Sequence, residues 1–336
     1  MRAVVIEGPG TVEVRDVADP APGPGQVVLR VDHCGVCGTD VHVLEGAFAP
    51  ARYPVIPGHE ICGEVVALGR GVAELREGDL VVVDPSGECG RCEHCRDARP
   101  NLCVEFGGPG LTRDGGCAEY VVVDAAKAYR LPEGVDARVA TLAEPLSCAL
   151  RGMDRLPQRM GSSYLVYGAG TMGALLAQLA RHAGASSVAV VETSASRRRR
   201  ALQLGADAVA ASADELDGAA WDVVIDATGV PRAIEDALRR VRRGGTYLQC
   251  GVAPAEATVP FAPARVAADE LTIVGSMGIR GTFGRALALL ARGDVVDADA
   301  MVTHRLGLDD YTEAIGLLRS GDGLKIQVAP TVAEVS

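Results

Sequence analysis

Hydrophobic positions in residues 1–150 fall in short runs that alternate with polar positions and are separated by glycine and proline. The segments QVVLRVDHCG (26–35) and GDLVVVDP (78–85) are typical of the region. Alternation with a period of two places the apolar side chains on one face of a strand, and the intervening Gly and Pro residues favour tight turns. The pattern therefore predicts a region built mainly of β-strands.

The pattern changes near residue 162, where apolar strands begin to alternate with amphipathic helical segments. Residues 163–184 show a strand, a glycine turn and a helix, and further apolar strands follow at 186–192, 206–212, 221–229, 244–251 and 270–278. Six strands at this spacing, mostly separated by helices, predict a doubly wound parallel sheet. The last fifty residues are predicted to form helices and turns.

Length and charge restrict the class of protein. The chain has 336 residues, which is long for one core, so two domains are expected. Its net charge of −11 argues against nucleic acid or an anionic membrane as a partner. The start, MRAVVIEGPG, has no signal-peptide pattern, and no run approaches the roughly 18 apolar residues of a membrane span. We therefore expect no membrane partner and a cytoplasmic location.

A cysteine cluster is the first chemical motif. The segment CGRCEHCRDARPNLC contains Cys89, Cys92, Cys95 and Cys103. Cytosolic thiols are kept reduced, so clustered cysteines there indicate metal binding or catalysis before disulfides. Short C-x2-C steps let thiolates converge, and four thiolates close a tetrahedral Zn²⁺ shell with no open position. Incidental or redox-active cysteines are the alternative, but the spacing favours a structural zinc site.

The second motif is the turn GAGTMG, in which Gly168, Gly170 and Gly173 form G-x-G-x-x-G between a strand and a helix. The first glycine permits the turn, the second lets the backbone approach a pyrophosphate, and the third lets helix and strand pack closely. Thr171 and Met172 then begin a helix whose N–H groups face the anion. These residues predict a dinucleotide-binding site.

The choice of dinucleotide depends on the next strand. Glu192 ends that strand near the ~20-residue offset expected of the acidic residue that binds a ribose 2′-hydroxyl. Arg197 opens a run of four arginines, and a cation there could accommodate the 2′-phosphate of NADP. The alternative is a solvated helix face after an N-cap serine. Because the Glu192 carboxylate would repel a phosphate, NAD is favoured, and dual use with NADP stays open.

A third group of residues lies in the β-rich region. Three short segments, HCGVCGTDVH, PGHE and LAEPLSCAL, supply a mixed set of thiol, imidazole, hydroxyl and carboxylate side chains: Cys37, Thr39, Asp40, His42, His59, Glu60 and Glu144. Thiolate, imidazole and carboxylate are the ligands of catalytic Zn²⁺ sites, which keep one position open. Any one of these residues alone could be structural. Their coincidence with the other two motifs favours chemistry.

Taken in order, GVCGTDVH, PGHE, the four-cysteine segment, DGGCAEY, EPLS, GAGTMG and DATG resemble the zinc-containing medium-chain dehydrogenases over nearly the whole chain. The resemblance implies an α/β protein with a GroES-like, zinc-binding catalytic domain at 1–150 and 285–336. It also implies a Rossmann dinucleotide-binding domain at 151–284. The EPLS form is similar to the sorbitol and arabinitol (polyol) dehydrogenase branch.

The resemblance also implies a ligand set and two zinc ions per chain. Cys37 and His59 would bind the catalytic zinc, and either Glu60 or Glu144 would complete its shell while the other holds or exchanges with water. Cys148 is a minor alternative as a thiolate ligand. In the Rossmann domain, Thr228 of DATG would join the cofactor-binding residues.

The implied reaction is hydride transfer from a secondary alcohol to nicotinamide. Zn²⁺ makes a bound alcohol more acidic, so its proton leaves near neutral pH. Thr39 resembles the hydroxyl that accepts this proton, and His42 resembles the imidazole that passes it to solvent through the cofactor ribose. Asp40 would support the site rather than react.

The substrate is less determined. Sorbitol dehydrogenases carry an Arg-Tyr pair that contacts polyol hydroxyls, whereas this chain has Gly278 and Ile279 there, or Arg280 if the alignment slips. Another small polyol, a cyclitol or a simple secondary alcohol is therefore expected, in either reaction direction. A threonine-type dehydrogenase usually has Asp in place of Glu144. A non-catalytic redox sensor would lack the Cys37–His59 pair. Family resemblance further implies a homodimer or homotetramer formed through the strand near ELTIVGS.

Overall fold

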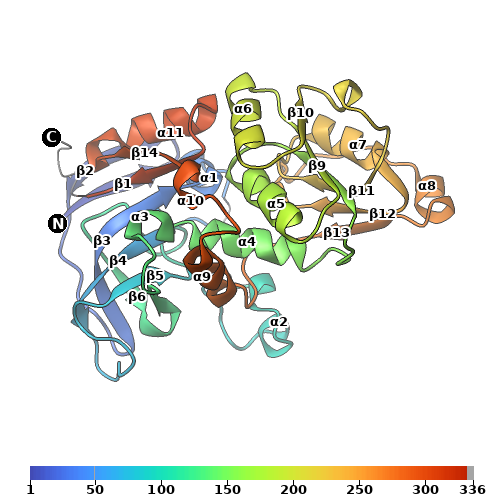
Figure 1. Ribbon diagram of the computed structural model, residues 1–336. Helices are drawn as coiled ribbons and strands as arrows, with labels where there is room; N and C mark the ends of the chain where they lie inside the picture. The colour runs from blue at the N-terminus through green and yellow to red at the C-terminus, as the bar shows by residue number, and fades with distance from the viewer. Residues whose placement is uncertain (49, 331–336) are drawn as a thin grey trace. The chain divides into compact units, whose positions relative to one another are not determined.

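The computed structural model describes residues 1–48 and 50–330. The chain divides into two compact units (Figure 1). The first contains Met1–Glu144, Ile279–Gly293 and the described residues from Ala298 onward, and the second contains Pro145–Gly278 and Asp294–Asp297. Helix α4 (Ala143–Met153) carries the chain from the first unit into the second.

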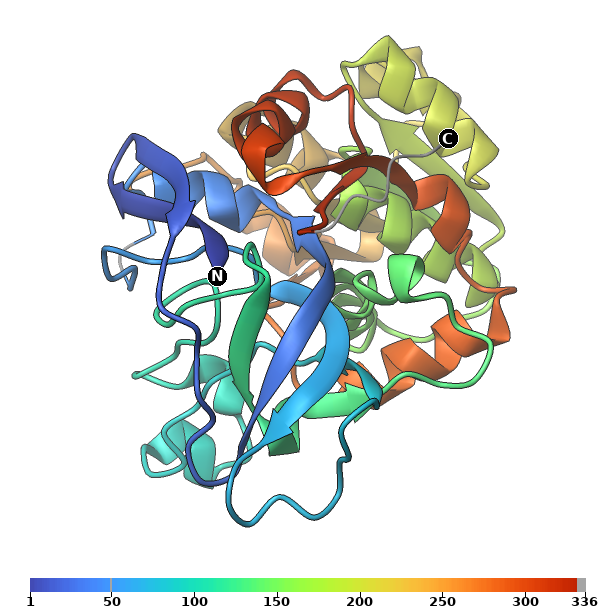
Figure 2. The ribbon, with the colours of Figure 1, turned by 90° about the vertical axis from the view of Figure 1, so that its left-hand side faces the viewer.

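The first unit contains a seven-stranded sheet in which neighbours run in the order β14-β15-β3-β4-β5-β7, with β6 also paired to β3 (Figure 2). A separate antiparallel ribbon is formed by β1 (Arg2–Gly8) and β2 (Thr11–Asp16). The strands of the sheet are β3 (Gln26–Val36), β4 (Glu60–Leu68), β5 (Leu80–Val83), β6 (Tyr120–Asp124), β7 (Ala128–Arg130), β14 (Val302–Leu306) and β15 (Lys325–Val328).

Short helices connect these strands. They are α1 (Gly38–Leu44), α2 (Glu93–Arg96), α3 (Ala137–Ala140), α9 (Phe283–Arg292), α10 (Ala298–Met301) and α11 (Tyr311–Ser320), with 3₁₀ turns at Pro100–Leu102, Ala125–Lys127 and Leu308–Asp310. The core of the unit combines alternate residues of β3, such as Val27, Leu29 and Val31, with Tyr311 and Ile315 of α11. The predicted β-rich region is confirmed.

The C-terminal segment differs in part from its prediction. Helices α9 and α11 are present as expected, but the segment also contributes strands β14 and β15. Strand β15 has only four residues, yet it lies between β14 and β3 and is buried along its length. The sequence KIQV alternates polar and apolar positions over only four residues, and its polar side chains are also buried and find partners within the unit, so its burial does not alternate. The prediction of helices and turns alone was therefore wrong.

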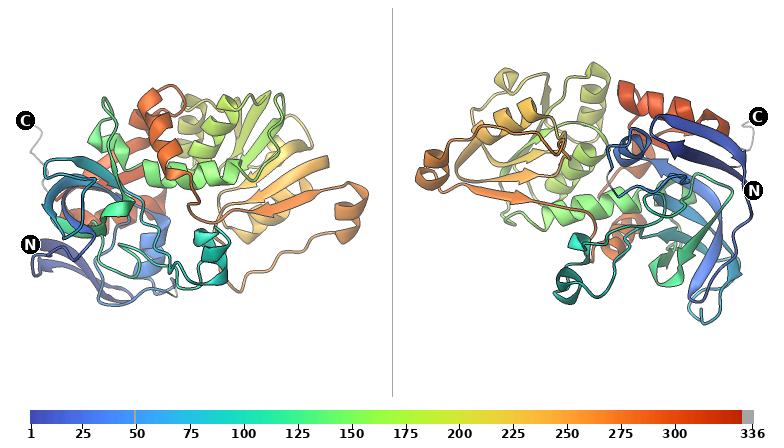
Figure 3. Two further views of the ribbon diagram at one scale, coloured as in Figure 1. Left: turned by 90° about the horizontal axis from the view of Figure 1, so that it is seen from below. Right: turned by 180° about the vertical axis from the view of Figure 1, so that it is seen from behind.

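The second unit contains six parallel strands in the order β10-β9-β8-β11-β12-β13 (Figure 3). They are β8 (Ser163–Tyr167), β9 (Ser187–Val191), β10 (Ala208–Ala210), β11 (Trp221–Asp226), β12 (Val241–Gln249) and β13 (Thr272–Gly275). The connecting helices are α5 (Thr171–His182), α6 (Ala195–Gln203), α7 (Pro231–Arg239) and α8 (Pro263–Ala268), with a 3₁₀ turn at Ala213–Glu215. The predicted doubly wound sheet is confirmed.

The order of these strands reverses between β8 and β11, and ligands bind at such a point outside the carboxyl ends of the strands. The glycine turn follows β8 there, and the DATG segment follows from the end of β11. Within the described residues, no helix combines the length and apolar character needed to cross a membrane.

Candidate functional site

Asp40 joins the two segments that carry the predicted catalytic ligands. It lies in α1, is fully buried, and accepts a hydrogen bond from the Cys37 amide at 2.8 Å through Oδ2. Its other oxygen, Oδ1, accepts a hydrogen bond from the Gly58 amide at 3.2 Å. One carboxylate thus fixes the loop before α1 against the PGHE turn, which brings Cys37 and His59 together.

His59 is 4 % exposed, and its Nδ1 atom lies 3.7 Å from Asp40 Oδ1. Burial opposes the protonated ring, but the Asp40 carboxylate and Cys37 outweigh it and raise the pKa of His59 well above its usual range. Nδ1 has no hydrogen-bond partner at standard distance among the described residues. A carboxylate behind a histidine is the arrangement that orients a metal-binding imidazole.

The donor atoms of Cys37, His59 and Glu60 lie within 4.8 Å of one another. A thiolate, an imidazole and a carboxylate suit Zn²⁺, and three protein ligands leave a position for water or substrate. The residues present therefore fit a catalytic zinc ion. Glu144 is half-buried in the first turn of α4 and lies outside this group, while Cys148 follows one turn later on the same helix.

Glu60 has a partner that the sequence analysis missed. Lys325 Nζ, on β15, lies 2.6 Å and 2.7 Å from the two Glu60 carboxylate oxygens and 3.3 Å from the Val36 carbonyl oxygen. The two side chains are 2 % and 0 % exposed. Burial works against the Lys325 ammonium, but the Glu60 charge outweighs it and raises the pKa of Lys325. The predicted zinc ligand is thus already held in a buried ion pair.

Gly35 makes room for this pair. A Cβ atom at Gly35 would lie 1.9 Å from Glu60 Oε2, so any larger residue would displace the carboxylate. Strand β3 pairs Gly35 with Glu60, and β15 pairs with β3 on its other side. Lys325 leaves no sequence motif, because a Lys in a short strand is normally exposed.

Thr39 and His42 lie three residues apart on α1, a spacing that places both on one face of a helix. The Thr39 hydroxyl oxygen lies 3.8 Å from Cys37 Sγ and is half-buried, whereas His42 is exposed. The two predicted relay residues therefore lead from the metal-ligand group toward the surface of this unit.

The four-cysteine segment forms a second compact group of donors. Sulfur–sulfur distances are 3.5 Å for Cys92–Cys95 and 4.0 Å for both Cys89–Cys95 and Cys92–Cys103. Zn–S bonds of about 2.3 Å in a tetrahedron place sulfurs about 3.8 Å apart. The segment therefore fits one zinc ion with no open position.

Backbone amides prepare these thiols for a cation. Amide donors at Cys95 and Val104 lower the pKa of Cys92 to about 6, and amides at Arg91 and Cys92 lower the pKa of Cys89. Desolvation and neighbouring sulfurs instead raise the pKa of Cys95 to about 12. Four thiolates cannot share this volume without a compensating positive charge, which a zinc ion supplies.

The glycine turn has the geometry that its sequence predicts. Gly168 has φ +93°, and a Cβ at Gly173 would lie 1.8 Å from the Gly168 carbonyl oxygen, so a side chain at either position would be strained or would clash. A Cβ at Gly170 would meet nothing within 4 Å. Gly170 is also the N-cap of α5, so the open space lies where Thr171 and Met172 begin the helix. This space fits a pyrophosphate.

Glu192 lies beside this turn. Its Oε2 accepts a hydrogen bond from the Ala169 amide at 2.9 Å, and its Oε1 accepts one from the Ser194 amide at 2.8 Å. Oε1 also accepts a hydrogen bond from the Thr193 hydroxyl at 3.3 Å, so Oε2 is the oxygen that keeps acceptor capacity for a ribose hydroxyl. Ser194 caps α6 through the Arg197 amide, and Arg197 Nε is buried without a partner among the described residues. Arg198 Nη1 donates a hydrogen bond to the Glu192 carbonyl oxygen at 2.6 Å.

Comparison with known families matches both units. Residues 23–133 match the alcohol dehydrogenase GroES-like domain, and residues 171–292 match the zinc-binding dehydrogenase family.

Individual relatives are similar over almost their full length. D-arabinitol dehydrogenase 1 of Uromyces fabae is 37 % identical over 98 % of this chain and 97 % of its own. L-threonine 3-dehydrogenase of Thermococcus kodakarensis is 34 % identical over 95 % and 94 %. A solved structure from Sinorhizobium meliloti 1021, described as a zinc-binding dehydrogenase bound to NADP, has a TM-score of 0.92 and 36 % identity, and covers 98 % of this chain and 99 % of that one.

Proposed function

Because this chain belongs to the zinc-containing medium-chain dehydrogenase family, we propose that it transfers hydride between a secondary alcohol of a small polyol or cyclitol and NAD. At the coarser level it is a zinc-dependent, NAD(P)-dependent alcohol or polyol dehydrogenase. The observation that carries the proposal is the Cys37–His59–Glu60 donor group with Thr39 beside it. We assign catalysis to residues 1–150 and 285–336, and cofactor binding to residues 151–284.

Cys37 and His59 would hold the catalytic zinc, with Glu60 or Glu144 as the third ligand, and the four clustered cysteines would hold a structural zinc. When bound, the catalytic ion acts as a Lewis acid that makes a substrate hydroxyl more acidic, and the nicotinamide accepts the hydride. Asp40 keeps the His59 ring in place. Lys325 donates one hydrogen bond to each Glu60 oxygen, and each oxygen keeps a second lone pair, so either Glu60 or Glu144 can complete the shell.

Thr39 and His42 would move the substrate proton. The Thr39 hydroxyl accepts the proton from the substrate oxygen as its own proton passes outward, and His42 delivers a proton to solvent. A half-buried hydroxyl next to Cys37 followed by an exposed imidazole suits this order.

The relay predicts different losses for its two members. Thr39→Val should lower kcat/KM by roughly 10²–10⁴-fold, because it removes the group beside the reacting oxygen. His42→Ala should cost roughly 10²-fold or less, mostly at low pH, because water and hydroxide can replace an exposed imidazole. The pH–rate profiles of both variants with added imidazole test this. If His42→Ala lowers kcat/KM equally at every pH and imidazole does not restore it, the relay assignment is contradicted.

The cofactor prediction concerns Glu192. NAD should give a higher kcat/KM than NADP, because the 2′-phosphate would lie against the Glu192 carboxylate. Glu192→Ala should narrow the difference in kcat/KM between NAD and NADP, because it removes that negative charge and leaves Arg197 available to the 2′-phosphate. The measurement is kcat/KM for both cofactors with wild type and variant. A 36 % identical structure is described as bound to NADP, so the opposite preference is a realistic outcome. A wild type with a higher kcat/KM for NADP would show that Arg197 and its neighbours outweigh Glu192.

The substrate class is tested with a panel of polyols, cyclitols, threonine and simple secondary alcohols, followed by NAD(P)H absorbance. Arg280 Nε donates a hydrogen bond to the Ala98 carbonyl oxygen in the four-cysteine segment at 2.9 Å. Because this guanidinium already has a partner within the chain, it does not replace the arginine that contacts sorbitol in sorbitol dehydrogenases, and we favour a polyol other than sorbitol. A threonine dehydrogenase is the second candidate because of the threonine dehydrogenase relative. Highest kcat/KM with threonine would replace the polyol assignment.

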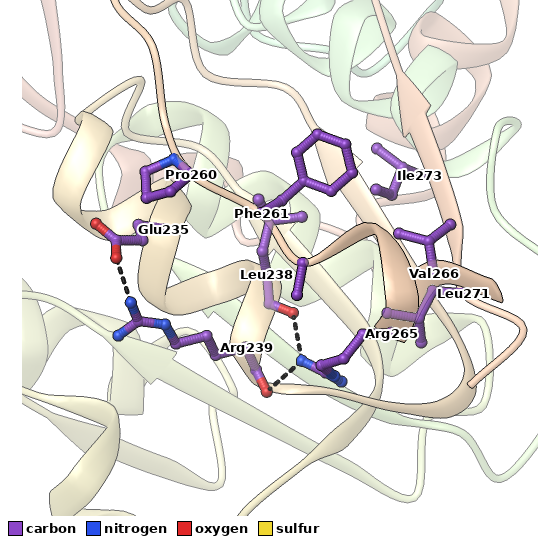
Figure 4. A pocket seen from close by; sticks show the side chains of 10 residues that line it. Glu235, Leu238, Arg239, Pro260, Phe261, Arg265, Val266, Leu271 and Ile273 are labelled. Atoms are coloured by element: carbon purple, nitrogen blue, oxygen red, sulfur yellow. Dashed lines mark hydrogen bonds and ion pairs between the residues drawn. The ribbon is translucent and has the colours of Figure 1, made fainter. Parts of the chain in front are cut away.

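We also propose a homodimer or homotetramer in which β13 pairs with the same strand of a second copy. β13 is an edge strand, and Ile273 and Phe261 beside it are 47 % and 56 % exposed. Figure 4 shows these side chains in a pocket with Leu238, Val266 and Leu271. An apolar edge of this kind is usually covered. Ile273→Lys should yield monomers by light scattering, and an unchanged mass would contradict the interface.

A further inference from the structure

Asp226 ends β11 at the carboxyl edge of the parallel sheet and is fully buried. Its Oδ1 accepts hydrogen bonds from the Thr228 amide at 3.2 Å and the Thr228 hydroxyl at 2.5 Å. Its Oδ2 accepts hydrogen bonds from the Gly229 amide at 2.9 Å and Gln249 Nε2 at 2.8 Å. One carboxylate therefore ties the loop after β11 to the end of β12.

The backbone of the same residue holds the next loop. The Asp226 carbonyl oxygen accepts hydrogen bonds from the Cys250 amide at 2.9 Å and the Gly251 amide at 2.8 Å. A Cβ at Gly251 would lie 2.5 Å from Asp226 Oδ2, and a Cβ at Gly229 would lie 2.1 Å from the Val252 carbonyl oxygen. The two glycines thus let both loops close around the carboxylate.

These loops touch the glycine turn. The Ala227 amide donates to the Tyr167 carbonyl oxygen at 2.9 Å, directly before Gly168. The Thr228 methyl group lies 2.8 Å from the position that a Cβ at Gly168 would occupy. Because Asp226 holds Thr228 through both its amide and its hydroxyl, it sets the position of the residue that packs on the first glycine of the turn.

We propose that Asp226 is a positioning residue for the dinucleotide, acting through Thr228 and the glycine turn without itself touching the cofactor. This inference rests on the proposed NAD(P)-binding function. An ionised carboxylate offers acceptors only, which matches four surrounding donors. Asparagine has the same shape, but its NH₂ group would face two of those donors. The turn would then lose the support that shapes its surface before the cofactor binds.

The test compares Asp226→Asn with Asp222→Asn, a matched carboxylate at the start of the same strand. Asp222 Oδ2 accepts hydrogen bonds from the Ser163 amide at 2.9 Å and hydroxyl at 2.7 Å, so its loss also weakens the sheet. Titration calorimetry with NADH and NADPH should show the Kd of Asp226→Asn raised about tenfold or more, in line with buried donors left unpaired. Asp222→Asn should change the Kd less than about twofold.

Two milder variants cover the case in which Asp226→Asn does not fold. Thr228→Val keeps a methyl group against the glycine turn but removes the hydroxyl that donates to Asp226 and accepts from the Val230 amide. Thr228→Ser loses the methyl group but keeps the hydroxyl that Asp226 holds, so Thr228→Val should weaken binding more than Thr228→Ser. Equal NADH affinity in wild type and Asp226→Asn, equal weakening by Asp222→Asn, or equal binding by both Thr228 variants would overturn the positioning role alone. A wild type that binds neither NADH nor NADPH would instead overturn the proposed function and this inference with it.

Discussion

Cys92→Ser is expected to remove one zinc ion per chain and to lower the free energy of unfolding by several kcal/mol. Structural zinc contributes an apparent binding free energy of about 10–16 kcal/mol to the folding of zinc-finger peptides, and here the ion would replace a core that the polar segment lacks. Cys92 is chosen because backbone amide donors lower the pKa of its thiol to about 6, which favours the thiolate that binds zinc. Metal analysis and calorimetry of the purified protein measure both effects.

His59→Ala is the matched control, because it removes a ligand from the other group of donors. It should also leave one zinc ion per chain, but the protein should stay folded and lose kcat/KM by about a thousandfold or more, since Lewis-acid catalysis contributes several kcal/mol. The contrast separates a structural from a catalytic ion. Wild-type protein without zinc, or Cys92→Ser with two zinc ions and an unchanged melting temperature, would contradict the assignment.

Lys325→Met is expected to lower the free energy of unfolding by about 3–5 kcal/mol. Removing one partner of a buried ion pair leaves the other charge uncompensated, and Glu60 is 0 % exposed. The double variant Lys325→Met with Glu60→Gln should recover part of the loss, because neither side chain of this pair then carries a charge. Urea unfolding followed by circular dichroism, at equal zinc content, measures the three free energies.

The exposed pair of Lys127 and Glu88 provides the control. Its atoms are 2.9 Å apart, but the side chains are 27 % and 29 % exposed, so Lys127→Met should cost less than about 1 kcal/mol. A loss in Lys325→Met no larger than that in Lys127→Met would show that Glu60 finds another partner. No recovery in the double variant would show that Lys325 acts through packing instead of charge.

Several parts of the fold could be predicted from the sequence because they depend on local motifs. The strand, turn and helix around Gly168 lie within one short segment, and each glycine meets a steric requirement of that segment. The same holds for the four cysteines, whose spacing alone lets their sulfurs converge within fifteen residues. The alternate residues Val27, Leu29 and Val31 of β3 lie in the core as their pattern indicates, although Val28 is buried as well. In each case the partners are close in sequence, so composition and spacing carry the information.

Other features depend on partners distant in sequence. Sequence analysis grouped Cys37 and His59 by their ligand chemistry and by family resemblance, whereas the structure shows the Asp40 carboxylate linking their two segments. Strands β14 and β15 were missed because each is short, and they are stabilised by pairing: β15 pairs with β3, and β14 pairs with β15. Asp226 appeared in the sequence only as a letter of DATG, and its role depends on loops after two different strands.

The sequence by itself determined the four-cysteine motif, the dinucleotide turn and the doubly wound sheet, since these follow from local spacing and periodicity. Only the tertiary structure decided that Glu60 meets Lys325, 265 positions later in the chain. The physical reason is that a buried charge is stable only beside its counter-charge. Which two residues share that buried volume depends on how β3, β4 and β15 pair, and no spacing within one segment contains that information.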